Sequence, residues 1–150
     1  MKTIPFTKEK FEDIKKEYEE LQVKRKDTVI HLTKARLMGD LSENGYYRST
    51  KTNLSSIDYN LRRLSNFIKY GYVIENTNKG FVDLGCRVTL ESDNGIQAYF
   101  LVGIYESDPK IGKISNVSPL GKSLLGKKVG ESIELETPSG KTNYKILKIE

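Results

Sequence analysis

The chain has 150 residues, of which 37% are hydrophobic and 30% charged, and it carries a net charge of +5. This length allows one domain or two small ones, and no apolar run approaches the roughly 20 residues that a membrane-spanning helix needs. The polar N-terminus predicts no signal peptide. The single cysteine, Cys86, excludes a disulfide within the chain, which fits the cytoplasm.

The first predicted element is a long amphipathic helix that starts after Pro5. Thr7 is placed to cap it, although Lys10 stands where a complete capping box has Glu. Steps of three and four residues then form a heptad seam. Its members are Phe11, Ile14, Tyr18, Leu21, Arg25, Thr28, Leu32 and Ala35, of which Arg25 and Thr28 are the weak points.

A second helix with the same spacing follows and ends before Gly71. Its seam residues are Tyr47, Thr50, Leu54, Ile57, Leu61, Leu64 and Ile68. Facing residues of an antiparallel hairpin have a constant sum of residue numbers. Here that sum is 82 for Leu32/Thr50, Thr28/Leu54, Arg25/Ile57, Leu21/Leu61, Tyr18/Leu64 and Ile14/Ile68. The sequence therefore predicts an antiparallel coiled-coil hairpin, on the order of 45 Å long at 1.5 Å per residue.

The segment 39–45 joins the two helices. Gly39 suits a left-handed helix end, and Ser42 or Asn44 suits the cap of the second helix. Asp40 and Glu43 place two carboxylates at this tip. One interpretation is that they bind a cation inside another molecule. The other is local, with Asp forming the turn and Glu interacting with the helix dipole.

Charge is distributed unevenly along the predicted hairpin. Residues 8–20 hold six acidic residues against four lysines, whereas residues 22–53 hold seven basic residues and three acidic ones. The seven are Lys24, Arg25, Lys26, Lys34, Arg36, Arg48 and Lys51. This pattern fits either a solvated helix surface or a stem that follows a phosphate backbone.

The second half predicts a small α+β domain after a linker at 76–80. The predicted elements are strands at 87–91, 96–104, 131–137 and 141–149, and a short helix that begins after Ser118 and stops at Gly126. Together they predict an antiparallel sheet with one helix packed on it. Cys86 is predicted to be a small buried hydrophobic residue.

No catalytic constellation stands out in this half. It has no histidine and no metal-ligand spacing. Residues 121–123 are similar to the end of a phosphate-binding loop, but Asn116 occupies the position of the first glycine of that motif.

Several motifs together resemble the bacterial Gre factors, and GreA more than GreB. The resemblance covers nearly the whole chain. It is carried by the start at 4–7, the tip signature at 35–44, the C-terminal signature at 114–121 with 124–127, and the turn at 137–140.

This resemblance implies an accessory factor of RNA polymerase that is not itself an enzyme. Residues 1–75 would form a coiled-coil hairpin, 76–80 a linker and 81–150 an FKBP-like domain that docks at the rim of the polymerase secondary channel. The hairpin would pass down that channel and stimulate the polymerase's own cleavage of the 3′ end of backtracked nascent RNA. A cytoplasmic monomer with no cofactor of its own, using the Mg²⁺ of the polymerase active site, is expected.

The resemblance also assigns roles to residues of the chain. Asp40 and Glu43 fall on the tip acidic positions, and we expect Asp40 to contribute most to the second Mg²⁺ and Glu43 to orient or deprotonate the attacking water. The basic residues nearest the tip, Arg36, Arg48 and Lys51, are candidates for guiding RNA. The candidates for polymerase docking, which could equally determine the fold, are Ser118, Pro119 and Leu120.

The tip departs from the usual family pattern, in which Ala-Glu-Tyr follows the Glu-Asn pair. Gly45 and Tyr46 replace the first two of these residues, which removes one negative charge and lowers helix propensity by about 1 kcal/mol. Met38, Tyr46 and Tyr47 either stack on a base or channel wall or pack under the tip. These departures leave open a regulator that occupies the channel without stimulating cleavage. The FKBP-like domain separately leaves open a prolyl isomerase, which its lack of tryptophan disfavours.

Overall fold

A computed structural model describes residues 1–39, 44–76 and 79–150 of the protein. The chain divides into two compact units. The first, called here the hairpin unit, consists of Met1–Thr3 and Phe11–Gly71. The second, called the C-terminal unit, consists of Ile4–Lys10 and Tyr72–Glu150.

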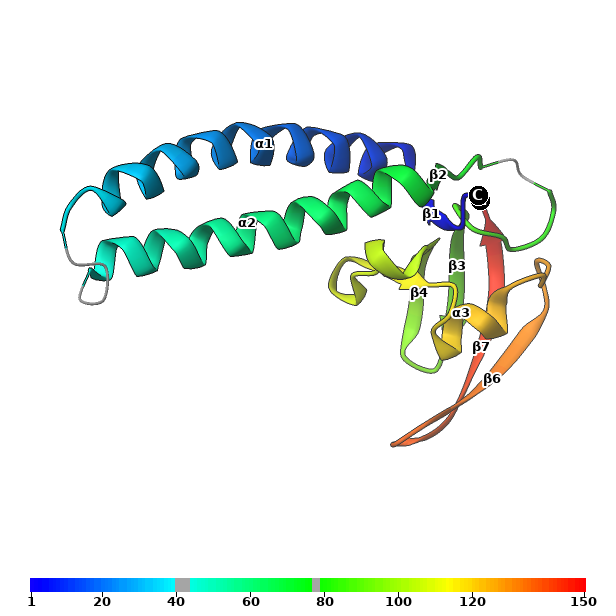
Figure 1. Ribbon diagram of the computed structural model, residues 1–150. Helices are drawn as coiled ribbons and strands as arrows, with labels where there is room; N and C mark the ends of the chain where they lie inside the picture. The colour runs from blue at the N-terminus through cyan, green and yellow to red at the C-terminus, as the bar shows by residue number, and fades with distance from the viewer. Residues whose placement is uncertain (40–43, 77–78) are drawn as a thin grey trace. The chain divides into compact units, whose positions relative to one another are not determined.

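The hairpin unit is built from two long helices, α1 (Lys8–Arg36) and α2 (Gly45–Tyr70). Figure 1 shows them side by side along their length. The buried side chains are Phe11, Ile14, Thr28, Leu32 and Ala35 of α1 and Thr50, Ile57 and Leu64 of α2. All eight belong to the predicted seam. The other predicted seam residues are half-buried, except Arg25, which is exposed.

Two sets of polar contacts across the helices agree with the predicted register. Arg25 Nε donates to Asp58 Oδ1 at 2.6 Å, and Asp58 follows Ile57, the residue predicted to face Arg25. That hydrogen bond and the negative charge of Asp58 raise the pKa of the Arg25 guanidinium. Nearer the tip, the Asn44 side chain links the carbonyl of Ala35 to the N–H of Tyr47, each at 3.0 Å. The residue numbers of Ala35 and Tyr47 also add to 82.

The C-terminal unit contains a five-stranded sheet with the order β5-β4-β3-β7-β6. Its elements are β3 (Arg87–Ser92), β4 (Gly95–Val102), β5 (Lys113–Ser115), α3 (Pro119–Leu124), β6 (Ser132–Thr137) and β7 (Gly140–Ile149). The predicted α+β class is confirmed. The prediction of a wholly antiparallel sheet was wrong in one pair, because β4 and β5 run parallel.

The parallel pair follows from the way the chain returns to the sheet. A parallel partner cannot be reached through a tight hairpin. The connection between β4 and β5 is made instead by two short 3₁₀ helices, η1 (Ile104–Glu106) and η2 (Pro109–Ile111). Neither these nor the three-residue strand β5 were predicted, since each is too short to show a periodic pattern.

One apolar core fills the C-terminal unit. Its buried members are Val82, Cys86, Val88, Leu90, Leu101, Ile114, Leu124, Ile133, Ile146 and Ile149. Cys86 is a free, buried thiol, as predicted for a small core residue. Helix α3 contributes Leu124 to the core, and Leu120 packs against it half-buried.

The segment Ile4–Lys10 belongs to the C-terminal unit, which was not predicted. Strand β1 (Ile4–Phe6) pairs with β2 (Gly71–Val73), and Phe6 is fully buried. Thr7 caps α1 as predicted, because its Oγ1 accepts from the Lys10 N–H at 3.2 Å.

A buried carboxylate from η1 completes this cap. Glu106 is only 6% exposed. Its two oxygens accept the Thr7 N–H at 3.0 Å and the Thr7 hydroxyl at 2.5 Å, and Lys113 lies 3.5 Å away. Negative charge at a helix N-terminus is favourable because the first amides lack partners. Glu106 therefore holds residues 4–10 within the C-terminal unit.

Replacement of this carboxylate should destabilise the C-terminal unit. We expect Glu106→Ala to lower its free energy of unfolding by about 2 to 3 kcal/mol, since hydrogen bonds to a charged acceptor are lost and the Thr7 amide is left unpaired. Native-state hydrogen exchange of the β3 and β4 amides measures this loss. The control is Glu134→Ala, which removes an exposed partner of Lys141 and should change stability by less than about 0.5 kcal/mol. Equal protection in the two variants would contradict the role of Glu106.

Candidate functional site

The predicted tip carboxylates, Asp40 and Glu43, lie outside the described residues, as does Ser42. The segments on either side of them are described. Beyond the end of α1, the N–H groups of Leu37 and Met38 bond to the carbonyls of Lys34 and Ala35 at 3.1 and 3.2 Å, which extends the helix by a tighter turn.

The flanks of the tip are fixed by local backbone geometry. Gly39 has φ +106°, in the left-handed region that was expected of it. Asn44 is extended, with φ −84° and ψ 94°, and its side chain accepts the Tyr47 N–H as the N-cap of α2. The structure therefore identifies Asn44 as a cap, one of the two residues that the sequence offered.

Asn44 also joins the two helices at this end. Its Nδ2 donates to the carbonyl of Ala35, which also accepts the Met38 N–H at the end of α1. One side chain thus bonds both a carbonyl at the end of α1 and an amide at the start of α2. Residues 40–43 are the short connection that this closure leaves between the helices.

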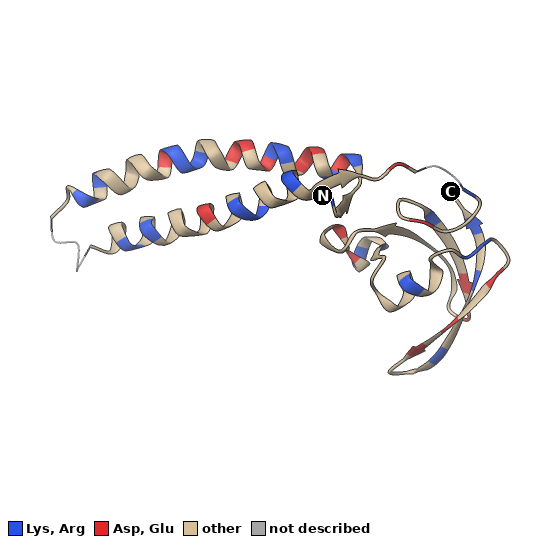
Figure 2. Ribbon diagram, turned by 45° about the vertical axis from the view of Figure 1, so that its right-hand side comes forward, with Lys and Arg blue, Asp and Glu red and all other residues tan. Residues whose placement is uncertain are grey.

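The three candidate RNA-guiding residues, Arg36, Arg48 and Lys51, are all exposed. They lie in the last turn of α1 and the first two turns of α2. Figure 2 shows charges of both signs along the early part of α1 and basic residues near its end. Among the described residues, none of the three has an ion-pair partner. The Arg36 guanidinium lies 6.0 Å from the ring centroid of Tyr47, at the limit of a cation–π contact.

The aromatic residues near the tip are held by different contacts. Tyr47 is half-buried in the seam, which fits the packing interpretation. Tyr46 is exposed, but its hydroxyl lies 3.1 Å from His31 Nδ1 on the other helix. Met38 is exposed beyond the end of α1.

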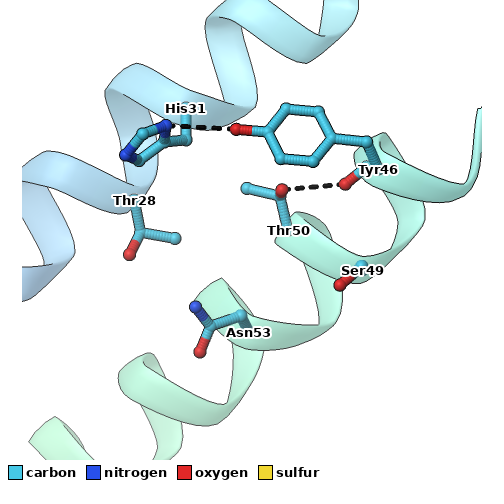
Figure 3. Close-up of a pocket in the computed structure, with 6 residues that line it drawn as sticks. All are labelled: Thr28, His31, Tyr46, Ser49, Thr50 and Asn53. Carbon is cyan, nitrogen blue, oxygen red and sulfur yellow. Dashed lines mark hydrogen bonds between the residues drawn. The ribbon is translucent and has the colours of Figure 1, made fainter.

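A polar groove opens between the two helices in the distal half of the hairpin (Figure 3). Its volume is about 340 Å³, and it is lined by Thr28, His31, Tyr46, Ser49, Thr50 and Asn53. The hydroxyls of Thr28 and Thr50 are bonded within their own helices, to Lys24 and Tyr46 carbonyls. The sequence marked Thr28 as a weak seam position, but the contact between His31 and Tyr46 was missed because neither residue belongs to the seam.

The three candidate docking residues differ in their structural roles. Ser118 caps α3: its Oγ accepts the Gly121 N–H at 3.1 Å and donates to the Ser115 carbonyl at 2.6 Å. Leu120 packs half-buried against the core, whereas Pro119 is exposed. Pro119 is thus the most accessible of the three residues to a partner.

The described residues bring together no group of three or more His, Cys, Asp or Glu side chains that could hold a metal ion. Within the same residues, no helix is long and apolar enough to cross a membrane.

Comparison with known protein families covers both units. A model described as the N-terminal part of transcription elongation factors matches residues 4–73, and one described as the C-terminal part of GreA/GreB matches residues 77–150. The chain belongs to the GreA/GreB family of transcription elongation factors. The resemblance found in its sequence is therefore confirmed.

Relatives named GreA span almost the whole of this Gre-family chain. Transcription elongation factor GreA of Bacillus subtilis is 41% identical over 152 residues, and that of Bacillus cytotoxicus is 39% identical over 153 residues. Each alignment covers 99% of this chain and 97% of the relative. The crystal structure of GreA factor homolog 1 of Thermus thermophilus is 23% identical, with a TM-score of 0.47 and 99% coverage of both chains. Family membership rests on the sequence matches.

Two glycines of this Gre-family chain should respond oppositely to alanine. A Cβ at buried Gly121 would collide with the Ser115 carbonyl oxygen, whereas one at Gly45 would meet nothing within 4 Å. We expect Gly121→Ala to destabilise the C-terminal unit by at least about 3 kcal/mol. Gly45→Ala should stabilise the hairpin by about 0.5 kcal/mol.

Hydrogen exchange of α2 and of β3 measures the two effects separately. If Gly121→Ala left the β3 amides as well protected as in the wild type, the tight contact between α3 and Ser115 would be contradicted.

Proposed function

We propose that this Gre-family protein binds RNA polymerase, inserts its hairpin through the secondary channel and stimulates cleavage of the 3′ end of backtracked nascent RNA. The protein is then an accessory factor in the cytoplasm, acting as a monomer, and the cleavage is the polymerase's own reaction. The main support is the closure of the hairpin by Asn44, which leaves the segment with Asp40 and Glu43 as the connection between two registered helices.

The length of the hairpin supports delivery of these carboxylates into another molecule. Helix α1 has 29 residues, so at 1.5 Å per residue it is about 43 Å long. A hairpin of this length would hold its tip much farther from its root than any single side chain could reach. Its apolar seam makes the two arms one rod, since each buries the other's seam residues.

The two tip carboxylates suit the cation of the polymerase reaction. Carboxylate oxygens are the ligands that Mg²⁺ prefers, and Mg²⁺ usually takes only one or two of them at a site while keeping several waters. Asp40 would supply a ligand to the second, weakly held Mg²⁺ of the polymerase. Glu43 would orient or deprotonate the attacking water. When bound, the ion stabilises charge on the scissile phosphate.

The exposed basic residues around the tip suit the RNA. Arg36, Arg48 and Lys51 have no ion-pair partner among the described residues, so their charges are available for phosphates. In the C-terminal unit, which would dock at the channel rim, Pro119 is exposed beside the Ser118 cap.

One observation favours a second candidate function, a regulator that occupies the channel without stimulating cleavage. Gly45 and Tyr46 stand where the family usually has Ala and Glu, and the Tyr46 hydroxyl is within hydrogen-bond distance of His31. The tip thus has an aromatic side chain in place of a third negative charge. Retention of Asp40 and Glu43 favours stimulation.

Removal of the tip carboxylates should separate cleavage from binding. The assay is RNA cleavage in stalled, backtracked complexes of the cognate polymerase, which we expect the wild type to accelerate. The double variant Asp40→Ala/Glu43→Ala should reduce that acceleration at least about 100-fold, because it lacks the groups that position the metal ion and transfer the proton. Asp40→Asn, which keeps the shape of the side chain, should also be impaired. Binding of each variant to the complex, measured in parallel, should be unchanged.

Two outcomes would contradict this mechanism. Unimpaired stimulation by Asp40→Asn would exclude Asp40 as a metal ligand. Binding of the wild type without any acceleration would favour the channel-occupying regulator.

Charge reversal on α2 tests the proposed contact with RNA. We expect Arg48→Glu/Lys51→Glu to reduce crosslinking of the factor to the RNA 3′ segment severalfold, because two phosphate contacts become repulsive. The matched control, Arg62→Glu/Arg63→Glu, reverses two exposed charges near the other end of the same helix. The RNA role would be contradicted if the two double variants crosslinked equally.

A further inference from the structure

Three large aliphatic side chains line one outward face of the distal hairpin. Val23 is 61% exposed, Ile30 52% and Leu37 82%. They are seven residues apart, so each is rotated by only about 20° from the one before it and lies about 10.5 Å further along the axis. Leu37 follows the last residue of α1 and continues its turn through the bond from its N–H to the Lys34 carbonyl. We call Val23, Ile30 and Leu37 the aliphatic stripe.

The stripe is confined to the distal half of the hairpin. The same heptad position in the root half is occupied by Glu9 and Lys16, both exposed and charged. Single exposed hydrophobic residues are ordinary on protein surfaces. Three at consecutive heptad positions form instead a second seam with no partner in the described chain, on the side of α1 away from its first seam.

The edges of the stripe are mainly basic between its members, whereas Glu19 and Glu20 border its root end beside Val23. Lys26 and Lys34 occupy the turns between its members, and neither has an ion-pair partner among the described residues. Asp27 is the single acidic residue on these turns. Thr33, which also lies there, uses its hydroxyl to bond the Val29 carbonyl at 3.0 Å. Opposite Lys26 and Lys34, a complementary surface therefore has apolar side chains bordered by acidic ones.

The chemistry of the stripe selects a protein surface over nucleic acid or lipid. Single-stranded RNA is bound through aromatic stacking and phosphate contacts, and aliphatic side chains offer neither. An anionic membrane would meet the six acidic residues of segment 8–20 on the same hairpin, and a membrane-bound helix presents a much broader apolar face.

The size of the stripe argues against a second copy of this chain. A stable interface buries about 800 Å² on each partner, whereas three aliphatic side chains supply on the order of 300 Å². In a dimer through this face, Lys26 and Lys34 of the two copies would also repel each other. The stripe is suited instead to a contact added to an existing complex, where a small area suffices because the partner is already held nearby.

We infer that the aliphatic stripe is a second binding surface for RNA polymerase, seated on a segment of the channel wall whose apolar side chains are bordered by Asp or Glu. This inference rests on the proposed function, because the hairpin must enter the channel to make the contact. The contact adds to the binding that the C-terminal unit provides, so its loss affects the affinity for polymerase.

The full-length triple variant Val23→Gln/Ile30→Gln/Leu37→Gln tests the stripe. Glutamine is a good helix former, and the three positions are exposed, so the fold should be retained. We expect the Kd for the stalled polymerase complex to rise about tenfold, from lost apolar burial, while the cleavage rate at saturating factor stays unchanged. The matched control Val23→Leu/Ile30→Leu/Leu37→Ile, which keeps the apolar surface, should bind like the wild type.

Two further measurements identify the partner even if the triple variant folds poorly. A photo-crosslinking benzoylphenylalanine at position 30 should capture a polymerase subunit. Lys26→Glu/Lys34→Glu should raise the Kd at low salt, since the partner's edges are acidic. Capture of RNA alone, of a second copy or of nothing would overturn the inference, as would tighter binding after charge reversal.

Failure of the inference can be told apart from failure of the proposed function. If the wild type binds and stimulates cleavage while the glutamine variant has the wild-type Kd, the stripe is not a binding surface and the proposed function stands. If the wild type does not bind polymerase, both are overturned.

Discussion

Antiparallel pairing of α1 and α2 in one register is the constraint on which the hairpin depends. Each apolar seam residue is buried only while its partner lies opposite, so a slip of one residue would expose much of the seam. Polar contacts at two levels fit only this register: Arg25 with Asp58 in the middle, and Asn44 with Ala35 and Tyr47 near the tip. This pairing brings the end of α1 next to the start of α2.

Long-range periodicity explains why the hairpin could be predicted from the sequence. Fifteen seam positions repeat over two helices, and their agreement on a single sum of residue numbers left little freedom of register. Strands β1, β2 and β5 have only three residues each, too few to show an alternating pattern. The bond between Thr7 and Glu106 joins residues 99 apart in the chain, and no local signal marks such a pair.

The candidate site was predictable to the extent that it follows from motifs. Asn44 was one of two possible caps, and its second bond, to Ala35, depends on the packing of the helices and has no sequence signal. In the C-terminal signature, by contrast, the motif was visible in the sequence but the structural role of its residues was not. Ser118 and Gly121 belong to a motif that resemblance links to polymerase, yet Ser118 caps α3 and Gly121 lies too close to Ser115 for any side chain. Fold requirements alone account for these two residues.

The two ends of the hairpin are built from different chemistry. The root seam contains Phe11, Ile14 and Leu64, all buried and apolar, whereas the distal seam contains Thr28 and Thr50 beside the buried apolar residues Leu32 and Ala35. Apolar burial contributes roughly 25 cal/mol per Å², so the two threonines contribute less to the pairing than apolar residues would, and Asn44 and the contact between His31 and Tyr46 add to it. Segments that act on a partner commonly come from the less stable parts of a fold. A rod whose distal seam is partly polar can adjust to a partner there, while the side chains that join its two arms keep their register.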